Sequence, residues 1–103
     1  GLYNQAIAML KGLHNISNND VEVKAGLGTA YLMKGDLKES ISYFSTIDDD
    51  YWEQAHIGIN YALASFLDGK KEKAIDILKE VNAEKLGSWK TYYKEVGKRI
   101  GVN

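Results

Sequence analysis

The chain has 103 residues, of which 45% are hydrophobic and 26% are charged, and its formal net charge is −1. This length and balance are typical of one globular domain, and a net charge near zero argues against a nucleic-acid-binding protein. The absence of cysteine excludes disulfides, thiolate metal sites and cysteine nucleophiles, and no apolar run is long enough to span a membrane.

The predicted elements are all helices, because apolar residues recur three or four positions apart and no alternating strand pattern of useful length occurs. The segment 37–48 illustrates this, with Leu37, Ile41 and Phe44 on one face. The fold class is therefore all-α. In chain order the six expected helices cover residues 2–14, 20–34, 37–48, 51–67, 70–82 and 88–100.

Several helix boundaries carry their own signals. We expect side-chain N-caps within the run Asn18-Asn19-Asp20 and at Asp36, Asp50 and Ser88, since Asn, Asp and Ser are favoured at that position. Asp36 and Asp50 are each followed by Glu three residues later, which is the spacing of a capping box. Lys70 stands at the corresponding position of the fifth helix and weakens its start signal. Glycines follow the second and fourth helices, where a left-handed C-terminal residue is expected.

Three segments of the chain align at a spacing of 34 residues without a gap. Such a period indicates a repeat architecture, in which each unit buries its apolar face against its neighbours. Five positions match in all three copies: Gly1/Gly35/Gly69, Ala6/Ser40/Ala74, Ile7/Ile41/Ile75, Leu10/Phe44/Leu78 and Leu13/Ile47/Val81.

A 34-residue period of two helices with glycine at the turn resembles the tetratricopeptide repeat (TPR) family. Two departures are Lys24, which replaces an early tryptophan, and the missing proline at the end of each repeat. The resemblance implies a right-handed superhelix of antiparallel helix pairs, an α–α solenoid. The second copy carries the match best, through Leu27-Gly28, Tyr31, Gly35-Asp36, Ser40, Phe44 and Ile47.

The resemblance organises the chain as a single TPR-like domain over 1–103. Residues 1–20 supply the second helix of a partial first repeat, 21–54 and 55–87 are full repeats, and 88–103 form a C-terminal capping helix. We expect a fragment of a longer array, the alternative being a natural end helix. Small residues at Gly28 and Ala62, facing Ser40 and Ala74, should let paired helices approach closely.

In TPR proteins the first helix of each repeat lines a concave groove that binds a peptide or a partner helix. Helix 51–67 is apolar nearly all round, so we expect its Ile59, Leu63 and Leu67 stripe to be covered. A carboxylate clamp is disfavoured, because Ala25, Thr29, Ile59 and Leu63 occupy the clamp positions. The groove residues implied by the resemblance are Glu22, Ala25, Gly26, Thr29, Met33, His56, Ile59, Asn60, Leu63, Leu67, Lys90, Tyr93, Lys94 and Gly97.

The functional expectation is a non-enzymatic scaffold that binds a largely apolar peptide or helix, one mode of peptide recognition. The alternative is a structural or self-associating segment, whose groove is filled within the molecule. Residues 15–68 hold nine acidic side chains and three lysines, whereas 69–103 hold nine basic and five acidic ones. This polarity would orient a partner, although solvated helix faces explain it equally well.

No catalytic, metal or cofactor site is expected. His14 and His56 are far apart in the sequence, and no pair of metal-ligand spacing occurs. His14 is expected to be structural, whereas His56 lies on the groove face. The run Asp48-Asp49-Asp50 lacks the spacing of a calcium loop and is assigned to helix capping. The compartment is left open, because a lack of cysteine fits the cytoplasm or the periplasm.

Overall fold

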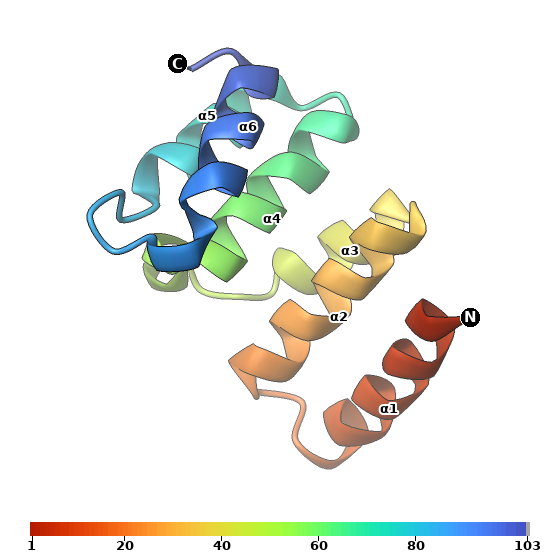
Figure 1. Cartoon of the computed structure of the whole chain (residues 1–103). Coiled ribbons are helices and arrows are strands. Elements are labelled where there is room, and N and C mark those ends of the chain that lie inside the picture. Colours follow the sequence, from red (N-terminus) through yellow and green to blue (C-terminus); the bar gives the residue numbers. More distant parts are fainter. Residues whose placement is uncertain (103) are drawn as a thin grey trace. The chain divides into compact units, whose positions relative to one another are not determined.

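A computed structural model describes residues 1–102 of the chain, and within this range every regular element is a helix (Figure 1). The all-α fold class and the six predicted α-helices are confirmed. None of the helices formed by these residues combines the length and the apolar character that a bilayer crossing requires. In chain order the elements are α1 (Leu2–Ile16), α2 (Val21–Lys34), α3 (Leu37–Phe44), the 3-10 helix η1 (Asp49–Glu53), α4 (Ala55–Leu67), α5 (Lys71–Glu80), the 3-10 helix η2 (Gly87–Trp89) and α6 (Lys90–Ile100).

The chain divides into two compact units, which are described separately. The first unit is Gly1–Ile47 and contains α1, α2 and α3; the second begins at Asp48 and contains η1, α4, α5, η2 and α6. In the first unit α2 packs against both α1 and α3 (Figure 1). In the second unit α4 packs against η1, α5 and α6.

The turn between α2 and α3 follows the predicted signals. The Asp20 carboxylate caps α2 by accepting hydrogen bonds from the backbone N–H groups of Glu22 and Val23. Gly35 ends α2 with φ 91°, a left-handed conformation that favours glycine. The Asp36 carboxylate then accepts a bond from the Glu39 N–H and starts α3. Both predicted caps and the left-handed glycine are confirmed.

A close contact joins α2 to α3 at Gly28. The Ser40 hydroxyl donates a 2.6 Å hydrogen bond to the Gly28 carbonyl, and both residues are buried. A Cβ atom at Gly28 would lie only 2.7 Å from the Phe44 ring, so glycine makes room for the aromatic side chain. The predicted close approach of small residues is therefore confirmed here.

The rest of the first core is apolar and aromatic. Its buried cluster comprises Ile7, Val23, Leu27, Ala30 and Tyr31. Leu10 and Tyr43 pack against this cluster from α1 and α3. The Tyr31 and Tyr43 rings stack at a centroid distance of 5.9 Å, an arrangement that adds modestly to the burial itself.

The second unit repeats the close packing between α4 and α5. Ala62 and Ala74 are both completely buried, as expected for the counterparts of Gly28 and Ser40. A second small position, Gly58, was not predicted. A Cβ atom there would overlap the carbonyl oxygen of Trp52 and the Val81 side chain. Gly58 therefore lets the η1 backbone and the end of α5 press against α4.

Helix α3 ends at Phe44, so the predicted extent of 37–48 is wrong. The hydroxyls of Ser42, Ser45 and Thr46 each donate to a carbonyl three residues earlier, at Glu39, Ser42 and Tyr43. Ser and Thr side chains that bond to the local backbone compete with continued helix. Three such residues in five positions explain the early end.

The predicted helix 51–67 is two elements. Residues Asp49–Glu53 form η1, Gln54 is extended with ψ 125°, and α4 begins at Ala55. The expected cap at Asp50 is also wrong, because the Asp48 carboxylate accepts the bond, from the Asp50 N–H. The acidic run does cap a helix, but that helix is the short η1.

The last two predicted helices are also shorter than expected. Helix α5 covers Lys71–Glu80 rather than 70–82, since Val81 is extended; Lys70 makes no side-chain cap bond, as its residue type suggested. Residues Gly87–Trp89 form η2 before α6 begins at Lys90. Neither η2 nor α6 has a side-chain cap, so the prediction of a cap at Ser88 is wrong.

Candidate functional site

The second unit carries a surface at which one face of α4 packs against α6, next to Trp89 of η2. We call it the α4–α6 surface and define it by His56, Asn60 and Leu63 of α4 with Trp89 and Tyr92. Residues 56, 60 and 63 share one face of α4, because they are spaced four and three positions apart. The Trp89 and Tyr92 rings lie 5.8 Å apart and extend this surface with aromatic groups.

A hydrogen bond between α6 and α4 lies at the centre of the surface. The Tyr92 hydroxyl donates to the Asn60 side-chain oxygen across 2.8 Å, and the Asn60 amide donates to the His56 carbonyl. Asn60 is buried and Tyr92 is half-buried. Burial raises the pKa of the Tyr92 hydroxyl above its ordinary value of 10.0, so the hydroxyl stays protonated and able to donate at neutral pH.

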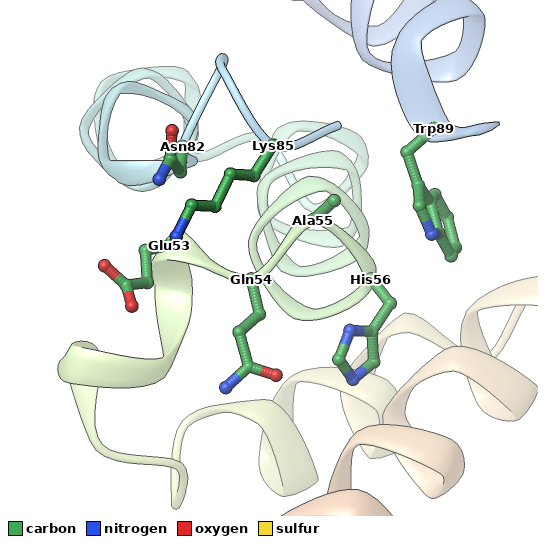
Figure 2. Close-up of a pocket in the computed structure, with 7 residues that line it drawn as sticks. All are labelled: Glu53, Gln54, Ala55, His56, Asn82, Lys85 and Trp89. Atoms are coloured by element: carbon green, nitrogen blue, oxygen red, sulfur yellow. The ribbon is translucent and has the colours of Figure 1, made fainter. Parts of the chain in front are cut away.

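A pocket of about 340 Å³ opens beside His56, and we call it the His56 pocket. Figure 2 shows Ala55 and His56, at the start of α4, between Lys85 and Trp89, with the Lys85 side chain extending toward Glu53. The pocket therefore offers an indole, an imidazole and charges of both signs. The loop that carries Asn82 is held there by a 3.0 Å bond from the Asn82 N–H to the Glu53 carbonyl.

A second pocket, of about 370 Å³, opens beside Leu63, and we call it the Leu63 pocket. Leu63, Tyr92 and Val96 give it an apolar wall, and charged side chains of α6 complete its lining: Glu95, Lys98 and Arg99. His56 and Leu63 are seven residues apart on α4, about 10 Å along the helix axis. Both pockets are in the size range of ligand pockets, which starts near 300 Å³.

The structure distributes the expected groove residues over both units. Glu22, Thr29 and Met33 lie on α2; Glu22 and Met33 are exposed and Thr29 is half-buried. On α4, Ile59 and Asn60 are buried, His56 and Leu63 are half-buried, and Leu67 is exposed. On α6, Lys90 and Lys94 are exposed and Tyr93 is half-buried. The α4–α6 surface brings together three of these residues: His56, Asn60 and Leu63.

Other residues of this surface were not predicted as site residues. Trp89, Tyr92, Lys85 and Glu53 are not among the groove residues that the resemblance implies. The missed signal was the aromatic pair itself, since Trp and Tyr are enriched at interfaces. The resemblance pointed to Tyr93 instead, whereas the structure places Tyr92 against α4.

The two histidines lie in different units of the chain, and the acidic run is exposed. The His14 ring meets Tyr43 edge-on at 5.6 Å in the first unit, and His56 lines its pocket in the second. The carboxylates of Asp48, Asp49 and Asp50 lie within 4.8 Å of one another and are exposed. Asp48 already serves as the cap of η1, which agrees with the capping role expected for this run.

The chain was compared with protein-family models, curated proteins and solved structures, and none of them matches.

Proposed function

We propose that this chain is a non-enzymatic protein-binding module of the TPR type, whose two full helix pairs stack as a right-handed solenoid. The internal 34-residue period supports this proposal. So does the similarity of equivalent positions in consecutive helix pairs, since Ser40 bonds to Gly28 in the first pair and Ala62 and Ala74 are both fully buried in the second. The module binds a peptide or partner helix and performs no chemistry itself.

The observation that carries the binding proposal is the pair of pockets on one face of α4. Aromatic side chains supply much of the binding energy at protein interfaces, and here Trp89 and Tyr92 are half-buried, with surface left to contact a partner. The Asn60–Tyr92 bond holds α6 against α4 between the two pockets. The surface is thus formed before a partner arrives, which lowers the entropic cost of binding.

The spacing of the pockets defines the partner. Two side chains about 10 Å apart correspond to seven residues of a helix or three residues of an extended chain. An aliphatic or aromatic side chain fits the Leu63 pocket, where Leu63 and Val96 provide apolar contact. A neighbouring carboxylate fits the rim made by Lys98 and Arg99.

Selection of displayed random peptides on the full chain, followed by titration of the enriched peptides, tests the proposal. We expect enriched peptides to carry one apolar anchor beside an acidic residue, and to shift the backbone amide resonances of His56, Leu63 and Tyr92. Leu63→Glu should weaken binding at least tenfold, because it places a charge in the apolar wall. Ala83→Glu is the matched control, since Ala83 is exposed and outside both pockets.

The circular dichroism spectra and unfolding midpoints of both variants must match those of the parent chain before binding is compared. Equal binding by the Leu63→Glu chain, or resonance shifts confined to the first unit, would count against this site.

A further inference from the structure

The short helix η1 is held in the second unit by contacts of Trp52 and Glu53. The Trp52 carbonyl lies at the place that Gly58 leaves open on α4, and the Trp52 ring meets the Tyr61 ring edge-on at a centroid distance of 5.8 Å. The Glu53 carbonyl accepts a 3.0 Å hydrogen bond from the Asn82 N–H, just after α5. These contacts join η1 to both α4 and the end of α5.

One group at this contact is unfavourably placed. The indole Nε1 of Trp52 is buried and has no hydrogen-bond partner among the described residues. A buried N–H group without an acceptor loses its bond to water and gains none in return. Release of η1 would return this group to solvent. The docked position of η1 is therefore less stable than its apolar contacts alone would make it.

Carboxylates also oppose the docked position. They line a pocket of about 430 Å³ that η1 shares with α5, and we call it the acidic pocket. No basic side chain is among the described residues that line it, and none of its carboxylates forms an ion pair with another residue in the range 1–102. Like charges that share a pocket repel one another. The five acidic side chains are Asp49, Asp50 and Glu53 of η1 with Asp76 and Glu80 of α5.

The position of η1 also determines part of the His56 pocket. Glu53 and Gln54 line this pocket together with His56 and Trp89. Figure 2 shows Glu53 on the side of the pocket away from Trp89. Release of η1 would therefore remove one wall of the His56 pocket, whereas an occupant that touches this wall binds only the docked form.

We propose that η1 is a strap over Gly58, which repulsion in the acidic pocket tends to release and an occupant of the His56 pocket holds in place. Salt screens the repulsion, because the Debye length falls from about 30 Å at 0.01 M to about 3 Å at 1 M. Salt and partner thus favour the same docked position. The effect of the partner rests on the proposed function, and the effect of salt does not.

The Asn82 amide reports the position of η1, because its proton is bonded to the Glu53 carbonyl and exchanges with solvent only after this bond opens. We expect its hydrogen exchange on the full chain, relative to the unprotected rate, to slow about threefold between about 0.01 M and about 1 M sodium chloride. The Lys70 amide, bonded to the Ser65 carbonyl in the same unit, is the control and should change less.

Asp76→Asn removes one carboxylate from the acidic pocket, so it should slow Asn82 exchange at low salt and weaken the salt dependence. Glu72→Gln, an exposed change of the same charge on the same helix and outside the pocket, is the matched control. Equal changes at Asn82 and Lys70 would overturn the proposal, because they would report the stability of the whole unit. So would an effect of calcium chloride that sodium chloride at equal ionic strength does not reproduce, because a bound cation would then act instead of screening.

Peptides enriched on the full chain test the effect of the partner. At a concentration about ten times its Kd, such a peptide should slow Asn82 exchange about tenfold, since it binds the docked form alone. A peptide that shifts the His56 resonance and leaves Asn82 exchange unchanged would overturn the coupling while the proposed function stands. If no peptide binds, the proposed function and the coupling fail together, and the salt dependence of Asn82 exchange still decides whether η1 is a strap.

Discussion

The hydroxyl of Tyr92 donates a 2.8 Å hydrogen bond to the side-chain oxygen of Asn60, and this bond joins α6 to α4. A net contribution of about 1 kcal/mol is typical of one such bond. Tyr92→Phe should therefore lower the free energy of unfolding by about 1 kcal/mol in urea denaturation. Tyr93→Phe, which removes the same group from the neighbouring half-buried side chain, should change it by less than about 0.5 kcal/mol. Equal losses in both variants would contradict this role of the bond.

The raised pKa of Tyr92 predicts a loss of stability in strongly alkaline solution. Burial disfavours the phenolate, so the folded chain keeps this proton at pH values where the unfolded chain, with a pKa near 10.0, has released it. The contribution of the Tyr92 hydroxyl to the free energy of unfolding is thus fully present below pH 10 and decreases as the pH rises above 10. Urea unfolding between pH 8 and pH 11 should show a steeper decline for the parent chain than for Tyr92→Phe. Parallel curves would exclude a contribution from Tyr92.

Tyr92 also illustrates how much of the structure can be predicted from the sequence. Periodicity predicted a helix over residues 88–100, since that signal is local. Which tyrosine meets α4 depends on the rotation of α6 about its own axis, which packing of the second unit determines. Asn60 was accordingly predicted as a groove residue, and its buried bond to Tyr92 was not foreseen.

The helix boundaries likewise divide into those that local signals determine and those that the packing of the unit determines. Caps with a strong local partner, such as Asp20 and Asp36, were predicted correctly because the bonding groups lie within three residues. The break at Gln54 was missed because it depends on the fold of the second unit. There the η1 backbone packs on Gly58, and this contact is invisible in a pattern of apolar residues.

Gly28→Ala should destabilise the chain, because its new Cβ atom would lie 2.7 Å from the buried Phe44 ring. Overpacking of this kind costs about 1 to 3 kcal/mol. Gly12→Ala provides the contrast: no atom lies within 4 Å of a Cβ there, and alanine favours helix by up to about 1 kcal/mol. Thermal unfolding should move in opposite directions for the two variants. Adding Phe44→Leu to Gly28→Ala should recover part of the loss, since the smaller side chain relieves the overlap.

Lys70→Asp should stabilise the chain by supplying the cap that α5 lacks. Lys70 stands one repeat after Asp36, and the two residues have similar backbone angles, φ −105° and ψ 69° against φ −92° and ψ 83°. An N-cap aspartate is worth about 1 kcal/mol over alanine. The substitution also removes the 3.3 Å ion pair between Lys70 and Asp68, but exposed pairs contribute between roughly 0 and 1 kcal/mol.

Lys70→Ala separates the two effects, because it removes the ion pair without adding a cap. The free energy of unfolding in urea should be highest for the Lys70→Asp chain, lower for the parent chain and lowest for the Lys70→Ala chain, with the first two differing by less than about 1 kcal/mol. An aspartate variant no more stable than the alanine variant would mean that the introduced carboxylate does not reach the N–H groups at the start of α5. The equivalence of the two helix starts, one repeat apart, would then fail at this position.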